Sequence, residues 1–292
     1  MCPEAGPALP PAGAGHSGGV PGFEQAGHFA GAMDLVLDRC RRELAAMRPA
    51  RVRRWAKANV FGGTEMVTAA DVAVQRALVR ACGRVLPGVP VVAEEGRRHL
   101  GAVPPTCVLI DPIDGTGPFL SGSPLYTMSV GLVVDERPSV AVVDFPAYEL
   151  RVWARATRGI EVRGDAGRLP AYGPSSLLTG PAQAAQVREV AARATGLSVE
   201  PVPTTSAKMV LVALSRAGAA LRVRGAAAGV APWDYAAAAL IVREAGGVVR
   251  DDGGRDLARG VVSPVNGWLA CRGPELAAVL HKIVTGDLHG AL

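Results

Sequence analysis

The sequence is poor in aromatic residues, and its few cysteines form no recognisable pattern. Aromatic residues make up 4% of the 292 residues, so alanine and aliphatic side chains must fill the interior. The five cysteines are scattered and include no Cys-x-x-Cys pair, which argues against a disulfide framework and against a zinc knuckle. Such cysteine usage suits a reducing compartment, and we expect a cytoplasmic protein.

Long hydrophobic runs are also missing. No segment approaches the ~20 apolar residues of a membrane-spanning helix, and the N-terminal region has no apolar signal-peptide core. We therefore expect no membrane partner. The net charge of +5 is mild. A basic stretch could steer an anion or touch nucleic acid, but it lacks stacking aromatics. We interpret it as a solvated helix end and loop, and expect no nucleic-acid partner. The stretch comprises Arg39, Arg41, Arg42, Arg48, Arg51, Arg53, Arg54 and Lys57.

Residues 1–22 are rich in glycine and proline without periodicity, which predicts a disordered tail. Two motifs occur inside it. Gly13, Gly15 and Gly18 match the dinucleotide-binding pattern GxGxxG, and residues 15–19 match the GxSxG pattern of serine hydrolases. Both motifs act only between a strand and a helix. No strand precedes them here, so neither indicates a function.

Hydrophobic periodicity then predicts alternating helices and strands. Thr68 has the features of a helix N-cap, with Asp71 as the acidic partner of a capping box. We predict an α/β (α+β) protein of two fused layered subdomains, 23–160 and 161–292. Predicted helices are 23–47, one from Thr68, 183–195, 205–217, 233–245 and one from about 274. Predicted strands are 89–93, 107–110, 126–134, 139–144, 220–224 and one from 248.

Four acidic residues stand where predicted apolar segments end or begin. They are Glu94, Asp111, Asp114 and Asp234. Because strands of one sheet finish along a common edge, these carboxylates can converge. At ~4 Å and an effective dielectric of ~20, each pair would repel by about 4 kcal/mol. Such a cluster requires cations or protons, and oxygen ligands without His or Cys favour Mg²⁺ or Mn²⁺ over zinc.

This arrangement suits the hydrolysis of phosphate monoesters, which is among the slowest uncatalysed reactions. Two metal ions about 4 Å apart can activate water and stabilise the leaving oxygen. In the segment 111–116, Gly115 allows a sharp turn and Thr116 can begin a short helix whose amides face an anion.

Five segments of the chain resemble the conserved blocks of the inositol monophosphatase family, in order and at compatible separations. They are Val92–Gly96, Ile110–Thr116, Trp233–Ala237, the upstream block Val67–Asp71 and the downstream block Glu244–Gly247. The resemblance spans roughly residues 28–285. It implies an αβαβα sandwich, a homodimer, a small phosphorylated metabolite as partner and inhibition by lithium.

The resemblance also implies two or three Mg²⁺ ions, for which Mn²⁺ could substitute. Glu94, Asp111 and the carbonyl of Ile113 would hold the first ion. Asp111, Asp114 and Asp234 would hold the second.

Catalytic roles follow by position from the same resemblance. Glu94 and Thr116 would position the attacking water, and Asp71 would hydrogen bond Thr116. Asp114 and the amides of Gly115 and Thr116 would contact the substrate phosphate.

The chain departs from the family pattern at several positions. Gly117-Pro118-Phe119 replaces the usual residues after the Gly-Thr pair, and Glu65 stands where aspartate is frequent. No acidic residue occurs in 225–232, where inositol-specific members carry a glutamate that binds ring hydroxyls. This difference argues against inositol phosphate as the preferred substrate.

Lys208 and Arg224 are similar to basic positions of a related branch, the 3′-phosphoadenosine 5′-phosphate phosphatases. They would bind a second phosphate or a nucleotide, although both could be ordinary surface charges. A small sugar, nucleoside, nucleotide or cyclitol monophosphate remains open as substrate.

Two other classes compete with this interpretation. A haloacid-dehalogenase phosphatase would have aspartates at i and i+2, the first a covalent nucleophile, whereas Asp111 and Asp114 are separated by three positions. A non-catalytic metal-dependent binding relative would be expected to have lost ligands, and none is missing here.

Overall fold

The computed structural model describes residues 23–96, 101–225, 229–260 and 262–287. The predicted tail 1–22, with its GxGxxG and GxSxG motifs, lies outside the described residues. Within the described part, no helix is both long and apolar enough to cross a membrane.

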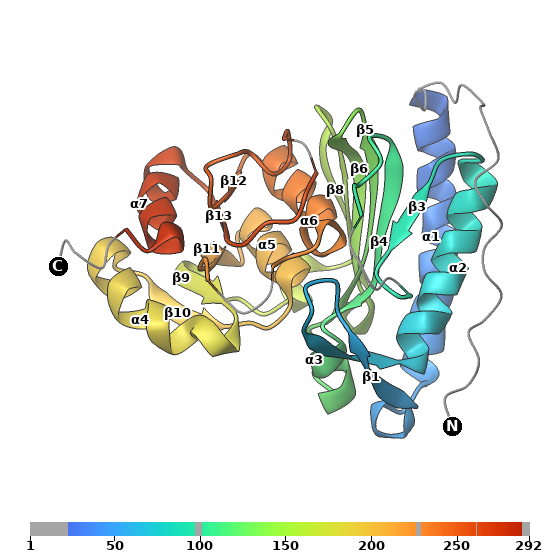
Figure 1. Ribbon diagram of the computed structural model, residues 1–292, viewed down its shortest axis with the longest axis horizontal. Coiled ribbons are helices and arrows are strands. Elements are labelled where there is room, and N and C mark those ends of the chain that lie inside the picture. Colours follow the sequence, from blue (N-terminus) through green and yellow to red (C-terminus); the bar gives the residue numbers. More distant parts are fainter. Residues whose placement is uncertain (1–22, 97–100, 226–228, 261, 288–292) are drawn as a thin grey trace.

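A six-stranded sheet forms the first half of the molecule, in the order β3-β4-β5-β6-β7-β8 (Figure 1). Strand β3 is parallel to β4, and the remaining neighbours are antiparallel. Helices α1 (Phe23–Ala46) and α2 (Ala69–Val85) cover one face. The strands are β3 (Val91–Ala93), β4 (Cys107–Asp114), β5 (Thr127–Val134), β6 (Arg137–Phe145), β7 (Leu150–Arg155) and β8 (Gly159–Arg163).

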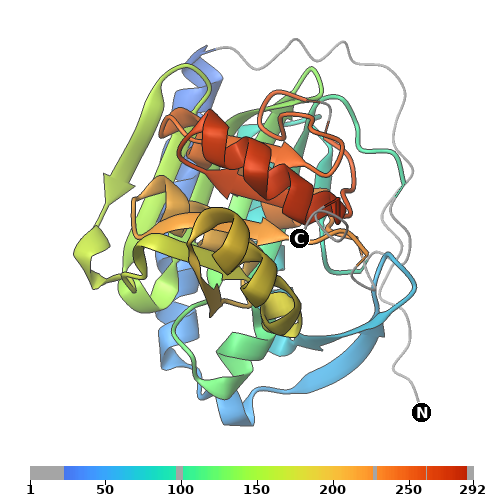
Figure 2. The same cartoon turned by 90° about the vertical axis from the view of Figure 1, so that its left-hand side faces the viewer.

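A five-stranded sheet forms the second half, in the order β10-β9-β11-β13-β12. Helices α4 (Pro181–Thr195) and α7 (Pro274–Thr285) pack against its outer face and against each other (Figure 2). The strands are β9 (Gly173–Thr179), β10 (Ser198–Pro201), β11 (Ala217–Arg222), β12 (Val248–Asp251) and β13 (Trp268–Cys271).

Helices α5 (Thr205–Ala213) and α6 (Pro232–Glu244) lie between the two sheets, which gives the layer order αβαβα (Figure 1). This arrangement confirms the predicted fold. The residues 236–239 of α6 are all alanine and all buried. Small side chains let the helix approach the sheet closely, so that Ala237 packs against Gly131 of β5. The low aromatic content is therefore matched by a thin, alanine-rich middle layer.

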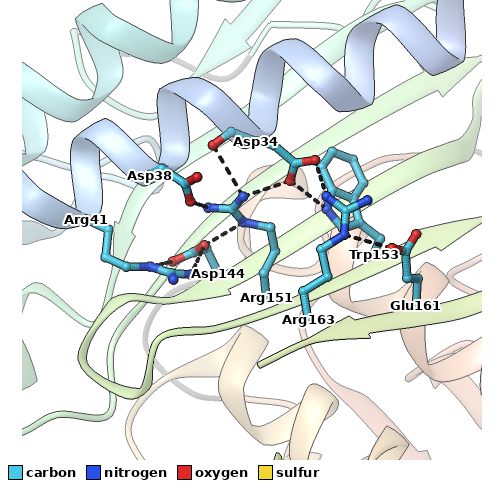
Figure 3. Close-up of polar contacts among 8 residues, drawn as sticks. All are labelled: Asp34, Asp38, Arg41, Asp144, Arg151, Trp153, Glu161 and Arg163. Carbon is cyan, nitrogen blue, oxygen red and sulfur yellow. Dashed lines mark hydrogen bonds and ion pairs between the residues drawn. The ribbon is translucent and has the colours of Figure 1, made fainter. Parts of the chain in front are cut away.

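An ion-pair network fastens α1 to the first sheet (Figure 3). Arg151 of β7 is only 4% exposed and donates to Asp34 and Asp38 of α1 and to Asp144 of β6, each at 2.7 Å. Arg41 of α1 also donates to the fully buried Asp144. Because each buried charge has an opposite partner, the network avoids the cost of an unpaired buried charge.

Most predicted elements are present, with shifted ends. The predicted helix 205–217 ends at Ala213, and β11 begins at Ala217 rather than 220. The boundary predicted at residue 160 falls inside β8, because β8 pairs with β7 and completes the first sheet. The division into subdomains remains a prediction.

The segment interpreted as a helix end and loop contains a strand instead. Strands β1 (Arg54–Ala58) and β2 (Thr64–Thr68) form an antiparallel hairpin. The mostly exposed β1 carries no hydrophobic alternation that would have predicted it.

Candidate active site

The segment after the buried part of β4 turns sharply and starts a short helix. The pairing of β4 with β5 is irregular between Asp111 and Asp114. Gly115 then adopts φ +96°, and a Cβ there would lie 2.7 Å from Thr204 Oγ1. Both features require glycine. Helix α3 follows as Thr116–Ser121. Pro118 lies in its first turn, where the missing N–H costs no helical hydrogen bond.

Thr116 and Asp71 are joined by a hydrogen bond. Thr116 Oγ1 donates to Asp71 Oδ1 at 3.0 Å and also contacts the carbonyl oxygen of Ile113 at 3.3 Å. Asp71 is fully buried, and its Oδ2 accepts from the backbone N–H of Thr68 at 2.8 Å. Thr68 in turn caps α2, so the predicted capping box is present. The cap thus holds the carboxylate that faces Thr116.

Asp114 links β4 to the middle layer. Its Oδ2 accepts from the backbone N–H of Ser206 at 2.6 Å, and its Oδ1 accepts from that of Thr205 at 3.3 Å. These N–H groups belong to the first turn of α5, which favours a negative charge. Burial raises the pKa of Asp114, while Ser206 and nearby Lys208 oppose that rise.

Asp234 lies in the first turn of α6 and reaches the same place from the other half of the chain. Its Oδ2 accepts from the backbone N–H of Ala231 at 2.9 Å. Burial, followed by the repulsion of Asp114, raises the pKa of Asp234 to about 8. The charge of Arg222 acts in the opposite direction.

Asp111 is repelled by all three of the other carboxylates. It is 2% exposed, and burial together with Glu94, Asp114 and Asp234 raises its pKa well above the ordinary value. The pKa of Glu94, which follows β3, is raised for the same reasons: burial first, then Glu95 and Asp234. The four predicted carboxylates, which come from three separate parts of the chain, are therefore close enough to repel one another.

Lys57 of β1 supplies the nearest positive charge to this cluster. Its ammonium lies 2.7 Å from Glu95, 3.1 Å from Glu65 and 3.2 Å from Glu94. Burial lowers its pKa, but the three glutamates outweigh burial and raise it overall. The interpretation of Lys57 as part of a solvated helix end was wrong. The sequence did not reveal the ion pairs of Lys57, because Glu65 lies on another strand and Glu94 and Glu95 lie in the loop after β3.

The donor set fits hard divalent cations. Asp111 Oδ1 is buried and has no hydrogen-bond partner among the described residues, and the neighbouring carboxylates repel one another. Across residues 23–96, 101–225, 229–260 and 262–287, however, no three acidic, His or Cys side chains already surround one point as a ligand set. A divalent cation held by these carboxylates would offset their repulsion, as Lys57 partly does for Glu94 in this structure.

A cavity of 170 Å³ opens beside the carboxylates. The β1–β2 hairpin forms one wall, where Asn59 Oδ1 accepts from the backbone N–H of Phe61 and Gly63. The Phe61 ring lies so close to Gly229 that a Cβ there would come within 2.7 Å of it. The described lining residues are Asn59, Val60, Phe61, Glu65, Glu94, Arg222, Gly229, Ala231, Trp233 and Asp234.

Neither of the two predicted basic substrate ligands is among those described lining residues. Lys208 is 3% exposed, and its ammonium donates to the carbonyl oxygen of Val202 at 2.9 Å. It also lies over the Trp268 ring, and burial lowers its pKa to about 8. Arg224 is exposed and pairs with Asp252 at 3.6 Å. Among the described residues, the basic side chain that does line the cavity is Arg222.

Comparison with known proteins identifies the class. The sequence profile of the inositol monophosphatase family matches residues 31–286, and the chain belongs to this family. It is a family of phosphatase type whose members generally depend on metal ions.

The names of individual relatives suggest different functions. The chain is 35% identical to a Streptomyces griseus protein named glucose-1-phosphate thymidylyltransferase, over 65% of this chain and 74% of that protein. It is 32% identical to the Nus factor SuhB of Salmonella typhimurium, over 67% of this chain and 75% of that protein. The Thermotoga maritima IMPase superimposes with a TM-score of 0.68 at 22% identity, covering 88% of this chain and 98% of that structure, which supports the fold.

Proposed function

We propose that this protein is a magnesium-dependent phosphomonoesterase that acts on a small phosphorylated metabolite. Water would attack phosphorus directly, without a covalent intermediate. The observation that carries the proposal is the mutual repulsion of Glu94, Asp111, Asp114 and Asp234, together with a buried oxygen of Asp111 that has no hydrogen-bond partner among the described residues. Such a cluster is costly without bound cations.

Two ions would be held as the family resemblance implies. Glu94, Asp111 and the Ile113 carbonyl would hold one, and Asp111, Asp114 and Asp234 the other. When bound, divalent ions neutralise charge on the phosphate and lower the pKa of water. Mn²⁺ is proposed as a substitute for Mg²⁺, since both favour oxygen ligands.

The protein's own residues would orient the nucleophile. Thr116 uses its hydroxyl proton in the bond to Asp71, so its oxygen remains an acceptor for a water O–H. Glu94 would accept a hydrogen bond from that water, as the family resemblance implies, and take up its proton during the attack. The new bond then forms between water oxygen and phosphorus as the ester bond breaks, and the departing oxygen takes up a proton from solvent to leave as the alcohol.

A covalent route through Asp111 has no support in the geometry. Asp111 is deeply buried among other carboxylates, whereas a nucleophilic carboxylate must reach phosphorus directly. Trapping a phosphoaspartate during turnover would nevertheless overturn the proposal of direct attack by water.

The decisive experiment measures phosphate release from a panel of sugar, nucleoside and cyclitol monophosphates, with and without Mg²⁺. Release that requires Mg²⁺ is expected from the wild-type protein. The Asp111→Asn variant should lose at least about a thousandfold of this activity and keep its circular dichroism spectrum, because one charge of the metal-binding set is removed. Near-normal turnover by that variant would contradict the assignment.

A non-catalytic, metal-dependent binding protein is the second candidate. It is favoured by one relative, which is named as a Nus factor rather than as an enzyme. The binder would show metal-dependent stabilisation by phosphorylated compounds but no phosphate release from the whole panel. The same experiment therefore separates the two candidates.

Three further proposals rest on the family resemblance and, for the compartment, on the scattered cysteines. The protein is expected to form a homodimer, to act in the cytoplasm and to be inhibited by lithium. Light scattering tests the dimer, fractionation tests the compartment, and lithium titration of phosphate release tests the inhibition. Finding only monomer at every protein concentration tested would refute the proposed homodimer.

A further inference from the structure

Two hydroxyl residues of β5 lie directly opposite the two aspartates of β4. In the antiparallel pairing of these strands, Asp111 is the partner of Ser129, and Asp114 is the partner of Thr127. The step from the first pair to the second is three residues on β4 and two on β5. Three positions along a regular strand would place Asp111 and Asp114 on opposite faces, and the extra residue restores a common face. Each carboxylate therefore has a hydroxyl residue as its cross-strand neighbour.

This face of β5 is the one that packs against the middle layer. Thr127 Oγ1 lies 2.5 Å from Ser206 Oγ of α5, and a Cβ added to Gly131 would lie 3.7 Å from Ala237 of α6. Because side chains alternate along a strand, Ser129 lies on the same face, between Thr127 and Gly131. It is 2% exposed and is therefore enclosed between the sheet and the two helices of the middle layer.

Ser129 and Asp111 each have a buried polar atom that is left unpaired. Within the part of the chain that the structure describes, neither Ser129 Oγ nor Asp111 Oδ1 has a hydrogen-bond partner. Leaving a buried donor or acceptor unpaired is costly. The Cβ atoms of cross-strand neighbours lie about 5 Å apart, and a serine hydroxyl changes direction by rotation about a single bond. The unpaired donor is thus able to reach the unpaired acceptor.

The neighbouring pair shows what a hydroxyl does here when it is paired. Ser206 donates its hydroxyl proton to Asp114 Oδ2 at 2.5 Å. Because Ser206 has only that one hydroxyl proton, its 2.5 Å contact with Thr127 is a bond that Thr127 donates. A chain of hydroxyl groups that begins on β5 thereby holds Asp114 in one orientation. Ser129 occupies the corresponding position on β5 for Asp111.

We propose that Ser129 is a positioning residue for the carboxylate of Asp111. The inference rests on the proposed metal-dependent function and deepens it. With divalent cations bound, the Ser129 hydroxyl donates to Asp111 and fixes the direction in which the carboxylate presents its oxygens. A hydroxyl that donates to an ionised carboxylate forms a strong, charge-assisted hydrogen bond. Asp111 is the side chain that would hold both ions, so its orientation affects the binding of each.

Metal affinity tests this role without requiring catalysis. Isothermal titration of the full chain with Mn²⁺ should show an affinity about tenfold or more weaker in Ser129→Ala, the usual effect of removing a hydrogen-bond partner of a metal ligand. Ser129→Thr keeps the hydroxyl and should retain most of the affinity. An Mn²⁺ affinity that is unchanged in Ser129→Ala would overturn the inference.

Thr179 provides a matched control. Its hydroxyl is also buried and has no hydrogen-bond partner in the described structure, but it belongs to β9 of the other sheet. Leu177, two residues earlier on the same strand face, belongs to the hydrophobic cluster that α4 and α7 cover. Thr179→Val removes the hydroxyl at similar volume and should leave the Mn²⁺ affinity unchanged. An equal loss of affinity in Thr179→Val and Ser129→Ala would mean a general packing effect and would overturn the inference.

Thermal unfolding separates positioning from a merely structural role. In the presence of a chelator, Ser129→Ala should have a Tm equal to or above that of the wild type, because the unpaired hydroxyl has been removed. Added Mg²⁺ should then raise the Tm of this variant less than that of the wild type. A lower Tm without metal, followed by a normal rise with Mg²⁺, would make Ser129 structural and overturn the inference. If Ser129→Ala does not fold, Ser129→Cys, which has only a weak donor, is titrated in its place with the same expected loss.

Phosphate release distinguishes failure of the proposed function from failure of this inference. If the wild-type protein releases phosphate, the Mg²⁺ concentration that gives half-maximal release should rise about tenfold in Ser129→Ala. A wild type that binds Mn²⁺ but releases no phosphate would refute the phosphomonoesterase, and the Mn²⁺ titrations of the variants would still decide the role of Ser129. A wild type that binds neither Mn²⁺ nor Mg²⁺ would overturn both proposals.

Discussion

Thr116 donates its hydroxyl proton to the buried carboxylate of Asp71 at 3.0 Å, although 45 positions separate the two residues in the chain. The carboxylate is itself held by the N-terminal cap of α2. The hydroxyl of Thr116 is therefore held in one orientation, in which its oxygen can still accept a hydrogen bond. The relationship joins a helix cap, which is structural, to a hydroxyl for which we propose a role in catalysis.

We expect Thr116→Ala to lower kcat by about a hundredfold or more while KM changes little. A group that orients the nucleophile acts mainly in the transition state, and removing positioned proton-transfer partners typically costs 10²–10⁴. Thr116→Ser keeps the hydroxyl and should retain much of the activity. Steady-state kinetics with one phosphomonoester decide the matter. A change confined to KM would contradict the proposed role.

The stability of the metal-free protein should fall as pH rises from about 4 to about 8. Asp234 has a folded-state pKa of about 8, above its ordinary value of 3.8. The folded protein therefore holds a proton that the unfolded chain has already lost. That stabilisation is complete below the ordinary pKa and disappears as pH passes through the raised one. Glu94 and Asp111 shift in the same direction.

Calorimetry at several pH values, after treatment with a chelator, measures this effect. Adding Mg²⁺ should flatten the dependence, because bound cations stabilise the ionised carboxylates. Asp234→Asn removes one of the titrating groups and should reduce the slope. A metal-free protein whose Tm rises over the same interval would show that the carboxylates do not repel one another as described.

Replacing Lys57 with methionine should destabilise the metal-free protein by about 2 kcal/mol or more. The substitution leaves Glu65, Glu94 and Glu95 without their shared cation. The expected value lies between those of exposed and fully buried ion pairs, because Lys57 is 16% exposed. Urea unfolding in the presence of chelator gives the free energy directly.

Arg39→Met is the matched control for Lys57→Met. Arg39 pairs with Glu43 on the exposed face of α1, where solvent screening leaves such a pair little effect on stability. If both substitutions destabilised the protein equally, the ion pairs of Lys57 would contribute no more to stability than an exposed ion pair.

Glu244, in the block that resembles the family's downstream motif, should matter for stability rather than for catalysis. Its carboxylate accepts from the backbone N–H groups of Thr157, Arg158 and Gly159 at 2.8 to 3.0 Å. It thereby fastens the β7–β8 turn to the end of α6. Glu244→Gln should lower the free energy of unfolding by about 1–3 kcal/mol, with kcat/KM unchanged. A selective loss of activity in a stable variant would disprove this.

Some features were readable from the sequence because they depend on neighbours in the chain. The capping box needs only Thr68 and Asp71, three positions apart, and it formed as predicted. The carboxylates Asp111 and Asp234 were identifiable because Asp111 follows a run of apolar residues and Asp234 opens a strongly apolar helix. In both patterns a charged group stands directly beside a buried segment. The layered α/β fold followed from the same alternation of apolar segments.

Other features depend on which elements become neighbours in space, and only the tertiary structure decided them. In the sequence, Lys57 looks like one more solvated basic residue. Its contact with Glu94, 37 positions further along, exists only because β1 lies beside the loop after β3 in the folded protein. Arg222 lines the cavity and Arg224 does not, because β11 ends at Arg222 and Arg224 lies two positions beyond it, where it is exposed and paired with Asp252. The end of the strand is set by its pairing with β13, which lies far away in the sequence. Local composition is nearly identical for both arginines and carries no information about that end.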